Sequence, residues 1–488
     1  MRHEPCEAIG RSKYEHLKQA ARRVKSVMLP FLALILTPRF VDVTTAMGMQ
    51  IGNDQACWVD VDNDGWTDLI AGGVVWHNEK GKGFTKLAEG VGMVVAADMD
   101  NDGYPDLFSW SQTKLYRNVG GKSFTAVPLP TMLSTVSRGA CWGDFDNDGL
   151  VDLYIGGYED WDKQITYPSF ILMNRGAKGF EVTWTDATHR SRGITACDFN
   201  RDGWLDVYAS NYRLQPNELW VNDGKGKFAS RAGEFNAIAT SAGFDGGHSI
   251  GAAWGDFDND GEFDLFAGNF AHVDSRGDQP KSRFLHNLGP KSGYKFEDKG
   301  TCGVWYQESY ASPAAADFDN DTNLDLYFTT VYGTASFNKP NFPVLYRNEG
   351  DFKFADVTEG SGLEKQVPTY QAAFADFRND GRLGLCTAGK LFANEGDAHQ
   401  WIEVRLEGNG KSINRSAIGA QVRIKLKNKT LTRQVEAGTG EGNQNDLRLH
   451  FGLGDLHGKV DLQITWPGGR KQTVRGQRTN QIVTVKAR

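Results

Sequence analysis

The chain has no long apolar run, no cysteine framework and few prolines. The apolar stretch Val27–Leu36 covers about ten residues, which suits the core of an export signal but is too short to span a bilayer. Six cysteines are present among 488 residues. Cys57 and Cys141 occupy the same position in different repeats, too far apart for a disulfide, and are predicted to be small buried thiols.

Familiar catalytic signatures are missing as well. Gly-x-Ser-x-Gly, His-Glu-x-x-His and Walker A patterns do not occur. The metal-ligand spacings of cysteine and histidine that mark soft-metal sites are absent from the repeats described next. The sequence therefore indicates no catalytic residue. Its most informative functional groups are the repeated carboxylates.

Seven copies of one acidic loop run through the chain. The first reads Asp60-Val-Asp62-Asn-Asp64-Gly65-Trp-Thr-Asp68. The other six begin at Asp98, Asp144, Asp198, Asp256, Asp317 and Asp376. Carboxylates recurring at positions 1, 3, 5 and 9 indicate a metal site repeated within a repeat architecture.

The donor set predicts calcium. Ca²⁺ takes six to eight oxygen ligands, and short carboxylates at four positions, with a backbone carbonyl at position 7, supply them. Gly at position 6 permits a sharp turn with positive φ. An EF-hand would need Glu at position 12, where the first loop has Ala71, and its flanks are apolar strand-like runs instead of helices.

The copies differ in completeness. Loop 4 has Asn200 at position 3, loop 6 has Thr322 in place of Gly, and loop 7 has Arg378 and Gly384 at positions 3 and 9. We therefore expect six calcium ions and an empty seventh loop, with the Arg378 guanidinium in place of an ion. The predicted ligands are Asp60, Asp62, Asp64 and Asp68; Asp98, Asp100, Asp102 and Asp106; Asp144, Asp146, Asp148 and Asp152; Asp198, Asn200, Asp202 and Asp206; Asp256, Asp258, Asp260 and Asp264; and Asp317, Asp319, Asp321 and Asp325.

Two further signals repeat in step with the loops. An Asn-x-Gly turn follows each loop, with one extra residue before the Gly in the first turn at Asn78, and a Phe opens a strand near each loop, starting with Phe40 and Phe84. Seven units of about four short strands predict an all-β chain with a seven-bladed β-propeller over residues 40–397, followed by a small β-sandwich domain over residues 398–488. The Phe40 strand is expected to complete the last blade and close the ring.

Charge separates the predicted domains. Residues 40–397 carry a net charge of −21 and residues 398–488 carry +9. The basic residues of the second domain are dispersed over alternating strands without a nucleic-acid motif, so we expect a solvated face, or one that docks on the acidic propeller. Residues 1–39 combine basic residues with the short apolar run, and we interpret them as an export signal-like or disordered segment of a secreted, extracellular or periplasmic protein.

These motifs carry a family resemblance. The acidic loops and Asn-x-Gly turns resemble the FG-GAP/VCBS repeats of integrin α-subunit heads. Ser416-Ala-Ile-Gly-Ala-Gln-Val-Arg423, Leu449-His-Phe-Gly-Leu-Gly454 and Thr465-Trp-Pro-Gly-Gly469 resemble an ASPIC/UnbV domain. Together they resemble the cartilage acidic protein family, which implies an extracellular calcium-binding matrix protein. Gly440-Glu-Gly-Asn-Gln444 departs from the Gly-Tyr and Ser-Gln residues usual in that family.

A ligand site is expected on the face opposite the metal loops, around the mouth of the channel. Counting back from each loop to the start of its inner strand, and adding the loops that open on the same face, gives a mixed set of cationic, aromatic and polar residues. The candidates are Asp54, Arg138, Tyr158, Arg192, Asn211, His248, Asn269, His272, Tyr332 and Tyr370. Such a set suits an anionic or polyhydroxy ligand.

Three functions remain open from the sequence. The leading one is a secreted, calcium-stabilised binding or adhesion module whose partner is an extracellular carbohydrate, a small anionic ligand or a protein. The alternative is an enzyme, a lyase, hydrolase or cyclase of natural-product or polysaccharide metabolism, that uses the same funnel with His248 and Tyr332 or Tyr370 as a base and acid pair. The third is a structural partner in a larger surface complex.

Overall fold

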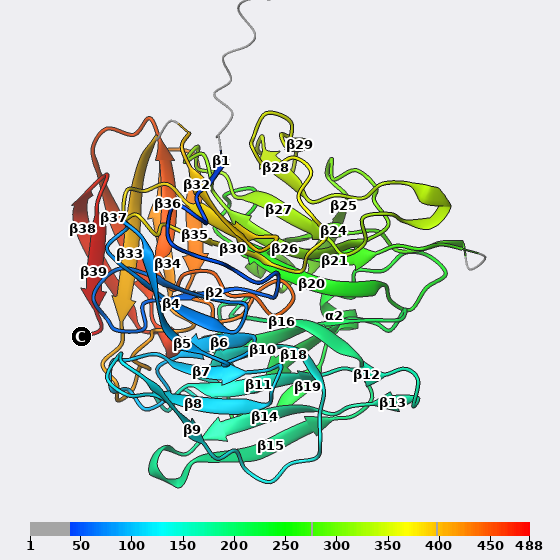
Figure 1. The fold of residues 1–488 in the computed structure, drawn as a ribbon, viewed down its shortest axis with the longest axis horizontal. Coiled ribbons are helices and arrows are strands. Elements are labelled where there is room, and N and C mark those ends of the chain that lie inside the picture. Colours follow the sequence, from blue (N-terminus) through cyan, green and yellow to red (C-terminus); the bar gives the residue numbers. More distant parts are fainter. Residues whose placement is uncertain (1–39, 275–276, 397–398) are drawn as a thin grey trace, which may run out of the picture. The chain divides into compact units, whose positions relative to one another are not determined.

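The computed structural model describes residues 40–274, 277–396 and 399–488, and the prediction for residues 1–39 falls outside them. The regular secondary structure of the described part is almost entirely β-strand (Figure 1). None of its helices has the length and apolarity needed to cross a membrane. The proposed boundary between residues 397 and 398 lies at undescribed positions.

Seven four-stranded antiparallel sheets form the blades of a propeller, and in the first six the strands run in chain order from the inner to the outer strand. Blade 1 has β2 (Cys57–Val59), β3 (Asp68–Ala71), β4 (Val74–Asn78) and β5 (Phe84–Glu89), and blade 2 has β6 (Val94–Ala97), β7 (Asp106–Ser109), β8 (Lys114–Asn118) and β9 (Phe124–Val127). Blade 3 has β10 (Ser137–Gly143), β11 (Asp152–Gly157), β14 (Ser169–Asn174) and β15 (Phe180–Asp186), and blade 4 has β16 (Ser191–Cys197), β17 (Asp206–Asn211), β18 (Glu218–Asn222) and β19 (Phe228–Ser230). Blade 5 has β20 (His248–Gly255), β21 (Asp264–Phe270), β24 (Arg283–Asn287) and β25 (Phe296–Gly300), and blade 6 has β26 (Tyr310–Ala316), β27 (Asp325–Thr330), β28 (Val344–Asn348) and β29 (Phe354–Asp356).

The seventh blade joins the two ends of the ring. It consists of β30 (Ala372–Ala375), β31 (Gly384–Thr387), β32 (Lys390–Asn394) and, as its outer strand, β1 (Phe40–Asp42). Phe40 lies opposite Asn394 in this antiparallel pair. The predicted closure by the Phe40 strand is confirmed, and it leaves no blade with a missing outer strand.

The Asn of each Asn-x-Gly turn links its blade to the preceding one. The Asn118 side-chain amide donates to the carbonyl of Pro105 in its own loop, at 2.9 Å, and to the carbonyl of Val61 in the loop of blade 1, at 2.8 Å. All seven turns make the second of these bonds, to the carbonyl at loop position 2 of the preceding blade. The donors are Asn78, Asn118, Asn174, Asn222, Asn287, Asn348 and Asn394. The repeated Asn therefore forms a circle of inter-blade hydrogen bonds at the level of the acidic loops.

Short elements decorate this ring. Two small ribbons, β12 (Glu159–Asp160) with β13 (Ile165–Thr166) and β22 (Val273–Asp274) with β23 (Gly277–Asp278), extend from blades 3 and 5. The helical turns are α2 (Ala232–Phe235), η1 (Gly176–Lys178), η2 (Pro290–Ser292), η3 (Ser336–Asn338) and η4 (Pro467–Gly469). Aromatic rings fill the spaces between blades, as where Trp58 stacks on Phe377 of the neighbouring blade.

The C-terminal strands form two sheets that share one core, coloured orange to red in Figure 1. One sheet has the order β36 (Leu449–Gly454), β33 (Gln400–Glu407) and β39 (Ile482–Lys486), and the other has the order β35 (Thr430–Gln434), β34 (Gln421–Lys425), β37 (Lys459–Thr465) and β38 (Lys471–Arg478). Alternating inward residues such as Val404, Val422 and Phe451 are fully buried, as period-2 strands in a sandwich require. The predicted fold, a seven-bladed propeller followed by a β-sandwich, is confirmed.

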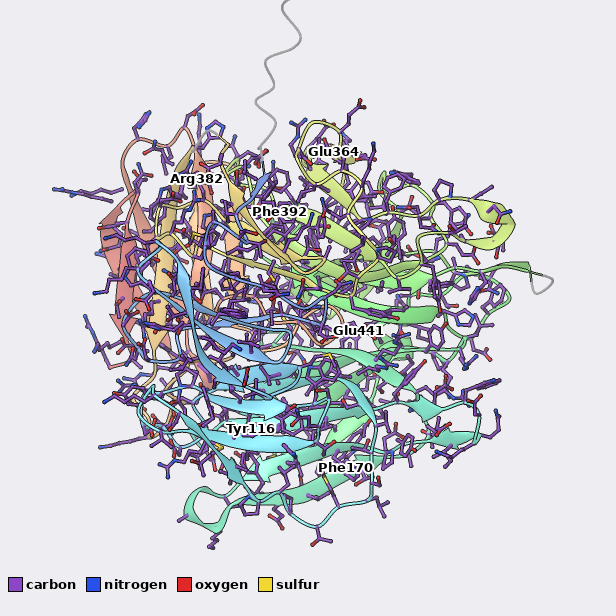
Figure 2. All side chains as sticks on the ribbon, in the orientation of Figure 1. Tyr116, Phe170, Glu364, Arg382, Phe392 and Glu441 are labelled. Atoms are coloured by element: carbon purple, nitrogen blue, oxygen red, sulfur yellow. The ribbon has the colours of Figure 1, made fainter. Side chains whose placement is uncertain are left out.

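The connection between β35 and β36 enters the centre of the propeller. We call residues 437–446 the channel segment. Its backbone and side chains bond to the inner strand, or the start of the inner strand, in every blade. The propeller residues contacted are Ala56 and Trp58, Ala96, Trp142, Arg192, Ala252, Ser312, and Ala372 with Phe374. Glu441, which Figure 2 labels among the propeller strands, is fully buried. The channel is thus filled by the second domain.

Candidate metal loops and ligand funnel

The acidic loops are shaped by hydrogen bonds between their own carboxylates and amides. In loop 1, Asp60 accepts the N–H groups of Asp64 and Gly65 at 3.0 and 2.9 Å. Asp68 accepts those of Val61 and Asn78 at 2.8 and 2.7 Å. The position-4 residue adopts a left-handed conformation, with φ of 59° at Asn63, and Gly65 has φ of 92°. Asn and Gly tolerate these angles best, which explains their recurrence in the sequence.

These turns aim the carboxylates at common points. Asp98, Asp100 and Asp106 of loop 2 place three oxygens within 4.8 Å of one another, and so do Asp144, Asp146 and Asp152 of loop 3. Burial raises the pKa of Asp68 and Asp106 to about 8 and that of Asp98 and Asp144 to about 7, because desolvation and neighbouring acids disfavour the charged forms.

Buried carboxylate oxygens that accept no hydrogen bond indicate whether the loops fit a cation. Asp198, Asp256 and Asp317, all at position 1 of their loops, are at least nine-tenths buried. The Oδ1 atom of each accepts no hydrogen bond from any described residue. Buried carboxylate oxygens without donors are costly unless a cation is bound. The all-oxygen donor set of these loops therefore fits a hard divalent ion such as Ca²⁺.

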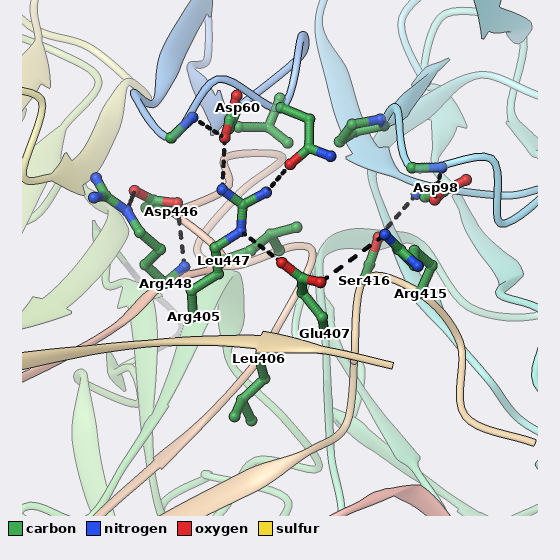
Figure 3. Close-up of a pocket in the computed structure, with 15 residues that line it drawn as sticks. Asp60, Asp98, Arg405, Leu406, Glu407, Arg415, Ser416, Asp446, Leu447 and Arg448 are labelled. Carbon is green, nitrogen blue, oxygen red and sulfur yellow. Dashed lines mark hydrogen bonds and ion pairs between the residues drawn. The ribbon is translucent and has the colours of Figure 1, made fainter. Parts of the chain in front are cut away.

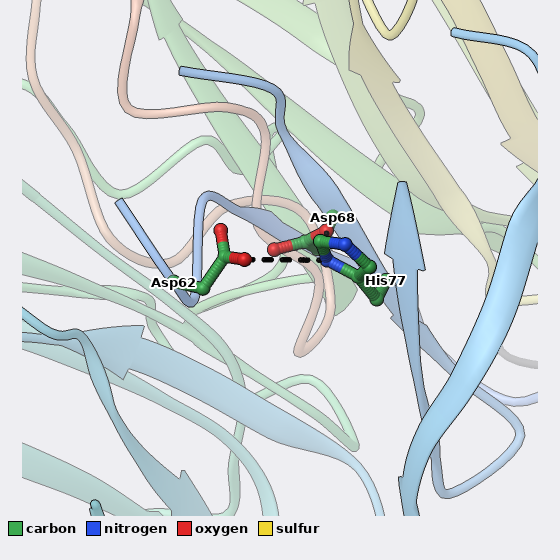
Figure 4. A group of neighbouring side chains, drawn as sticks. All are labelled: Asp62, Asp68 and His77. Atoms are coloured by element: carbon green, nitrogen blue, oxygen red, sulfur yellow. Dashed lines mark ion pairs between the residues drawn. The ribbon is translucent and has the colours of Figure 1, made fainter. Parts of the chain in front are cut away.

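Histidines join two of the clusters. His77 Nδ1 lies 3.2 Å from Asp68 and 3.6 Å from Asp62 (Figure 4). His286 stands in the same relation to Asp264 and Asp258, at 3.0 and 3.5 Å. Both histidines directly precede the Asn of the Asn-x-Gly turn, so a search for His at that repeat position would have found them. The sequence reasoning missed them because it examined the loops alone.

Loop 7 differs from its expected arrangement. The Arg378 guanidinium, predicted to stand in for the ion, pairs instead with Glu395 at 2.6 Å. Arg448 of the second domain donates to the Asp376 carbonyl at 2.9 Å and lies against Asn379. The Arg378 prediction is corrected accordingly: the guanidinium turns away from the loop because Glu395, the middle residue of the Asn394-Glu395-Gly396 turn, offers it a partly exposed partner.

The second domain covers the loop-bearing face of the propeller. Arg405 donates to Asp60 at 2.9 Å in loop 1, and the Ser416 hydroxyl accepts the Asp98 N–H at 3.0 Å in loop 2 (Figure 3). In loop 4, Gln434 accepts the Asp198 N–H at 3.1 Å. A cavity of about 70 Å³ remains between Asp60, Asp98, Arg405 and Arg415. The basic strands thus dock on the acidic loops, as the opposite charges of the two regions anticipated.

A cluster of cations and aromatic rings lies at the opposite end of the channel. The Arg192 guanidinium is 5.2 Å from the ring centroids of Tyr158, Tyr212 and Tyr370, and it donates to the Tyr370 hydroxyl at 3.0 Å. Its Nε donates to Glu441 of the channel segment at 2.7 Å. Burial raises the pKa of the Glu441 carboxyl, while Arg192 and Arg138 oppose that shift. Sequence reasoning could not place Glu441, which is distant in the chain.

The other candidate funnel residues differ in how close they lie to the Arg192 cluster and in what they contact. Arg138 lies over the Tyr158 ring at 5.5 Å, so it belongs to the Arg192 cluster. His248 contacts both Tyr212 and His272, with ring centroids 4.9 Å apart in each case, and Tyr332 contacts Phe270. Asp54 is exposed, and its carbonyl accepts a hydrogen bond from Gln371.

Two of the candidate funnel residues are buried, and their side-chain amides bond to other parts of the propeller. Asn211 is fully buried and donates to the Pro216 carbonyl at 2.7 Å. Asn269 is buried and donates to the Lys281 carbonyl at 3.1 Å. Each side-chain oxygen also accepts a serine hydroxyl from the inner strand of its blade. Because these amides already hold neighbouring strands together, we leave both residues out of the proposed ligand funnel.

Family models match both regions. The ASPIC and UnbV model matches residues 410–488, and the FG-GAP-like repeat model matches residues 98–155 and 198–267. Among solved structures, an Agrocybe aegerita lectin that recognises terminal N-acetylglucosamine aligns at 15% identity over 63% of this chain and 80% of its own, with a TM-score of 0.38. The extracellular domain of a hybrid two-component system from B. thetaiotaomicron aligns at 8% identity over 91% and 59%, with a TM-score of 0.44.

Curated relatives agree with the family models. Cartilage acidic protein 1 of Mus musculus is 26% identical over 314 residues, covering 60% of this chain and 45% of the relative. The Xenopus tropicalis protein is 28% identical over 297 residues, covering 57% and 42%. The aligned part of the chain spans less than half the length of these relatives. The chain is thus a homologue of cartilage acidic protein 1 that contains FG-GAP-like repeats and an ASPIC and UnbV domain.

Proposed function

We propose that this protein is a secreted calcium-binding propeller that acts as an extracellular binding or adhesion module. The observation that supports this most directly is the set of buried position-1 carboxylates whose oxygens lack donors among the described residues. Residues 40–397 would form the propeller domain and residues 398–488 the docked sandwich domain.

Calcium would be held by loops 1 to 6 through the Asp residues at positions 1, 3, 5 and 9, with Asn200 in loop 4. Bound there, the ion supplies positive charge between carboxylates that otherwise repel. The same loops carry the inter-blade Asn bonds and contact the second domain. Calcium loading would therefore stabilise the blades and the domain interface together.

The ligand would bind at the funnel around Arg138, Tyr158, Arg192 and Tyr370. Three tyrosine faces surround the Arg192 guanidinium, whose charge is balanced from below by Glu441. Arg138 is half-buried and forms no direct ion pair with an acidic side chain of the described residues, so its guanidinium can meet an anionic or polyhydroxy ligand. Carbohydrate, a small anionic molecule or a protein segment all offer such groups.

The experiment is thermal unfolding of the purified protein in EDTA and in excess calcium, together with metal counting. We expect a large upward shift in Tm with calcium and about six bound ions by the loop count. The funnel is tested separately by Arg138→Ala, which should weaken ligand binding without changing the calcium shift. Equal Tm values with and without calcium would contradict the proposal.

A further inference from the structure

A second hollow on the propeller lies outside the funnel and the metal loops. It is a groove of about 470 Å³ on blade 6, between the segment that leads into β26 and the connection from β27 to β28. Its lining includes Trp305, Tyr306, Gln307, Glu308, Asn341 and Phe342. The volume falls within the usual range of small-ligand sites.

Two aromatic side chains form an exposed surface in this groove. Trp305 and Tyr306 are 37% and 40% exposed, although large rings are commonly buried. Their polar ends are already bonded, since Trp305 Nε1 donates to Asp356 at 3.0 Å and the Tyr306 hydroxyl donates to the Ala271 carbonyl at 2.8 Å. Phe342 packs against Trp305 with ring centroids 5.6 Å apart. The rings are therefore fixed, and what they offer to a ligand is their apolar surface.

Beside the rings lies an amide with an unused donor. Asn341 is 6% exposed, and its Nδ2 has no hydrogen-bond partner among the described residues. A buried amide without a partner is costly unless a ligand or ordered water accepts from it. The neighbouring Gln307 is fully engaged, because it donates to and accepts from the Phe342 backbone at 2.9 and 2.8 Å. Of these two neighbouring amides, Asn341 is therefore the one with a donor left for a ligand.

The backbone of the groove favours a small polar ligand over a peptide. The N–H groups of Ala335 and Asn341 donate to the carbonyls of Lys339 and Gly333 at 2.8 and 3.1 Å. An extended peptide added to this loop would need such groups to be unpaired. What remains is aromatic surface, a side-chain amide donor and the Lys339 ammonium, which suit the apolar face and the hydroxyl groups of a sugar ring.

We propose that this groove is a saccharide-binding site, separate from the funnel. The sugar ring packs on Trp305 and Tyr306, and a ring oxygen or hydroxyl accepts from Asn341 Nδ2. Glu308 connects the two sites, because its carboxylate accepts from Ser336 at 2.8 Å and lies 3.3 Å from His272 at the funnel. The inference goes beyond the proposed funnel, and its own residues can be tested without altering the funnel.

The test is saturation-transfer NMR on the calcium-loaded protein with glucose, galactose, N-acetylglucosamine and glucuronic acid as probes. We expect at least one of them to bind, with affinity reduced by about tenfold or more in Trp305→Ala and in Asn341→Ala. Trp161→Ala is the matched control, because Trp161 is 49% exposed and stacks under Arg213 away from this groove. The control should bind as the unmodified protein does.

Each other outcome overturns the inference. Binding lost in Arg138→Ala but kept in Trp305→Ala would place the sugar in the funnel and leave the proposed function intact. Binding to none of the probes, or only to a proline-rich peptide added as a comparison, would reject the saccharide site. An unchanged calcium-dependent Tm in Trp305→Ala and Asn341→Ala shows that both variants are folded.

Discussion

Arg192 and Glu441 are joined by an ion pair with both side chains buried, although they belong to different domains and stand 249 positions apart. Arg192 is the second residue of the inner strand of blade 4, and Glu441 lies in the middle of the channel segment. The pair ties the second domain into the floor of the funnel.

Removing the carboxylate should destabilise the protein strongly. Glu441→Gln leaves the Arg192 guanidinium buried without a counter-charge, which typically costs on the order of 3–5 kcal/mol. The double variant Arg192→Met, Glu441→Leu should recover much of that loss, because neither side chain is then charged. Urea unfolding in excess calcium measures both, and a Glu441→Gln variant as stable as the parent would contradict this role for the pair.

The channel segment packs closely against the inner strands of the blades, so we predict that position 193 requires glycine. A Cβ on Gly193 would lie 2.1 Å from the Gly440 carbonyl oxygen and 2.7 Å from Gly251 Cα. Because backbone atoms cannot move aside cheaply, Gly193→Ala should cost roughly 1–3 kcal/mol or more. Gly458→Ala is the control, since a Cβ there meets no atom within 4 Å. Chemical denaturation of the two variants should separate them clearly.

Metal counting can assign ions to single loops. Asp256→Asn replaces a buried loop 5 carboxylate, so we expect one calcium fewer per chain and a lower Tm. Asp376→Asn makes the same change at position 1 of loop 7, which lacks carboxylates at positions 3 and 9 and is expected to hold no ion. Its calcium content should stay unchanged. Equal losses in the two variants would show that loop 7 also binds metal.

The inter-blade asparagines should contribute to stability individually. Asn348 donates to the Phe257 carbonyl at 2.8 Å and to the Leu324 carbonyl at 3.0 Å while fully buried. Asn348→Ala leaves both carbonyls unsatisfied, so we expect a loss of about 2–3 kcal/mol in the free energy of unfolding. Asn428→Ala is the comparison, because Asn428 is exposed at the turn between β34 and β35, and it should change stability by less than about 0.5 kcal/mol.

Stability should also depend on pH through His189. Hydrogen bonds to Asp186 and Glu218, at 2.8 and 3.1 Å, raise its pKa to about 9 in the folded state. A raised folded pKa means that the stabilisation is complete below the unfolded pKa of about 6.5 and is lost as pH rises through about 9. In saturating calcium, the parent should lose more stability than His189→Gln between these pH values. Parallel pH profiles would argue against a charged His189.

Local repetition made the architecture readable from the sequence. Carboxylates at fixed spacing, Gly65 with its positive φ and the Phe residues that open the outer strands each depend on neighbouring residues only, so the pattern alone predicted blades, loops and ring closure. The Asn of each turn was counted correctly as a repeat marker, but its bond to the preceding blade became visible only in three dimensions.

Contacts between distant residues were decided by tertiary structure. The sequence placed Arg138, Tyr158, Arg192 and Tyr370 on one face, but it gave no sign that Glu441 fills the channel beneath them. Arg378 pairs with Glu395 and not with its own loop, and the Asn211 and Asn269 amides bond to the Pro216 and Lys281 carbonyls. These partners belong to the same blades, but only the folded path of the strands and their connections brings them within reach. Repeat spacing determined which residues lie at the start of each inner strand, and packing in three dimensions determined which partners their side chains meet, including Glu441 from the second domain.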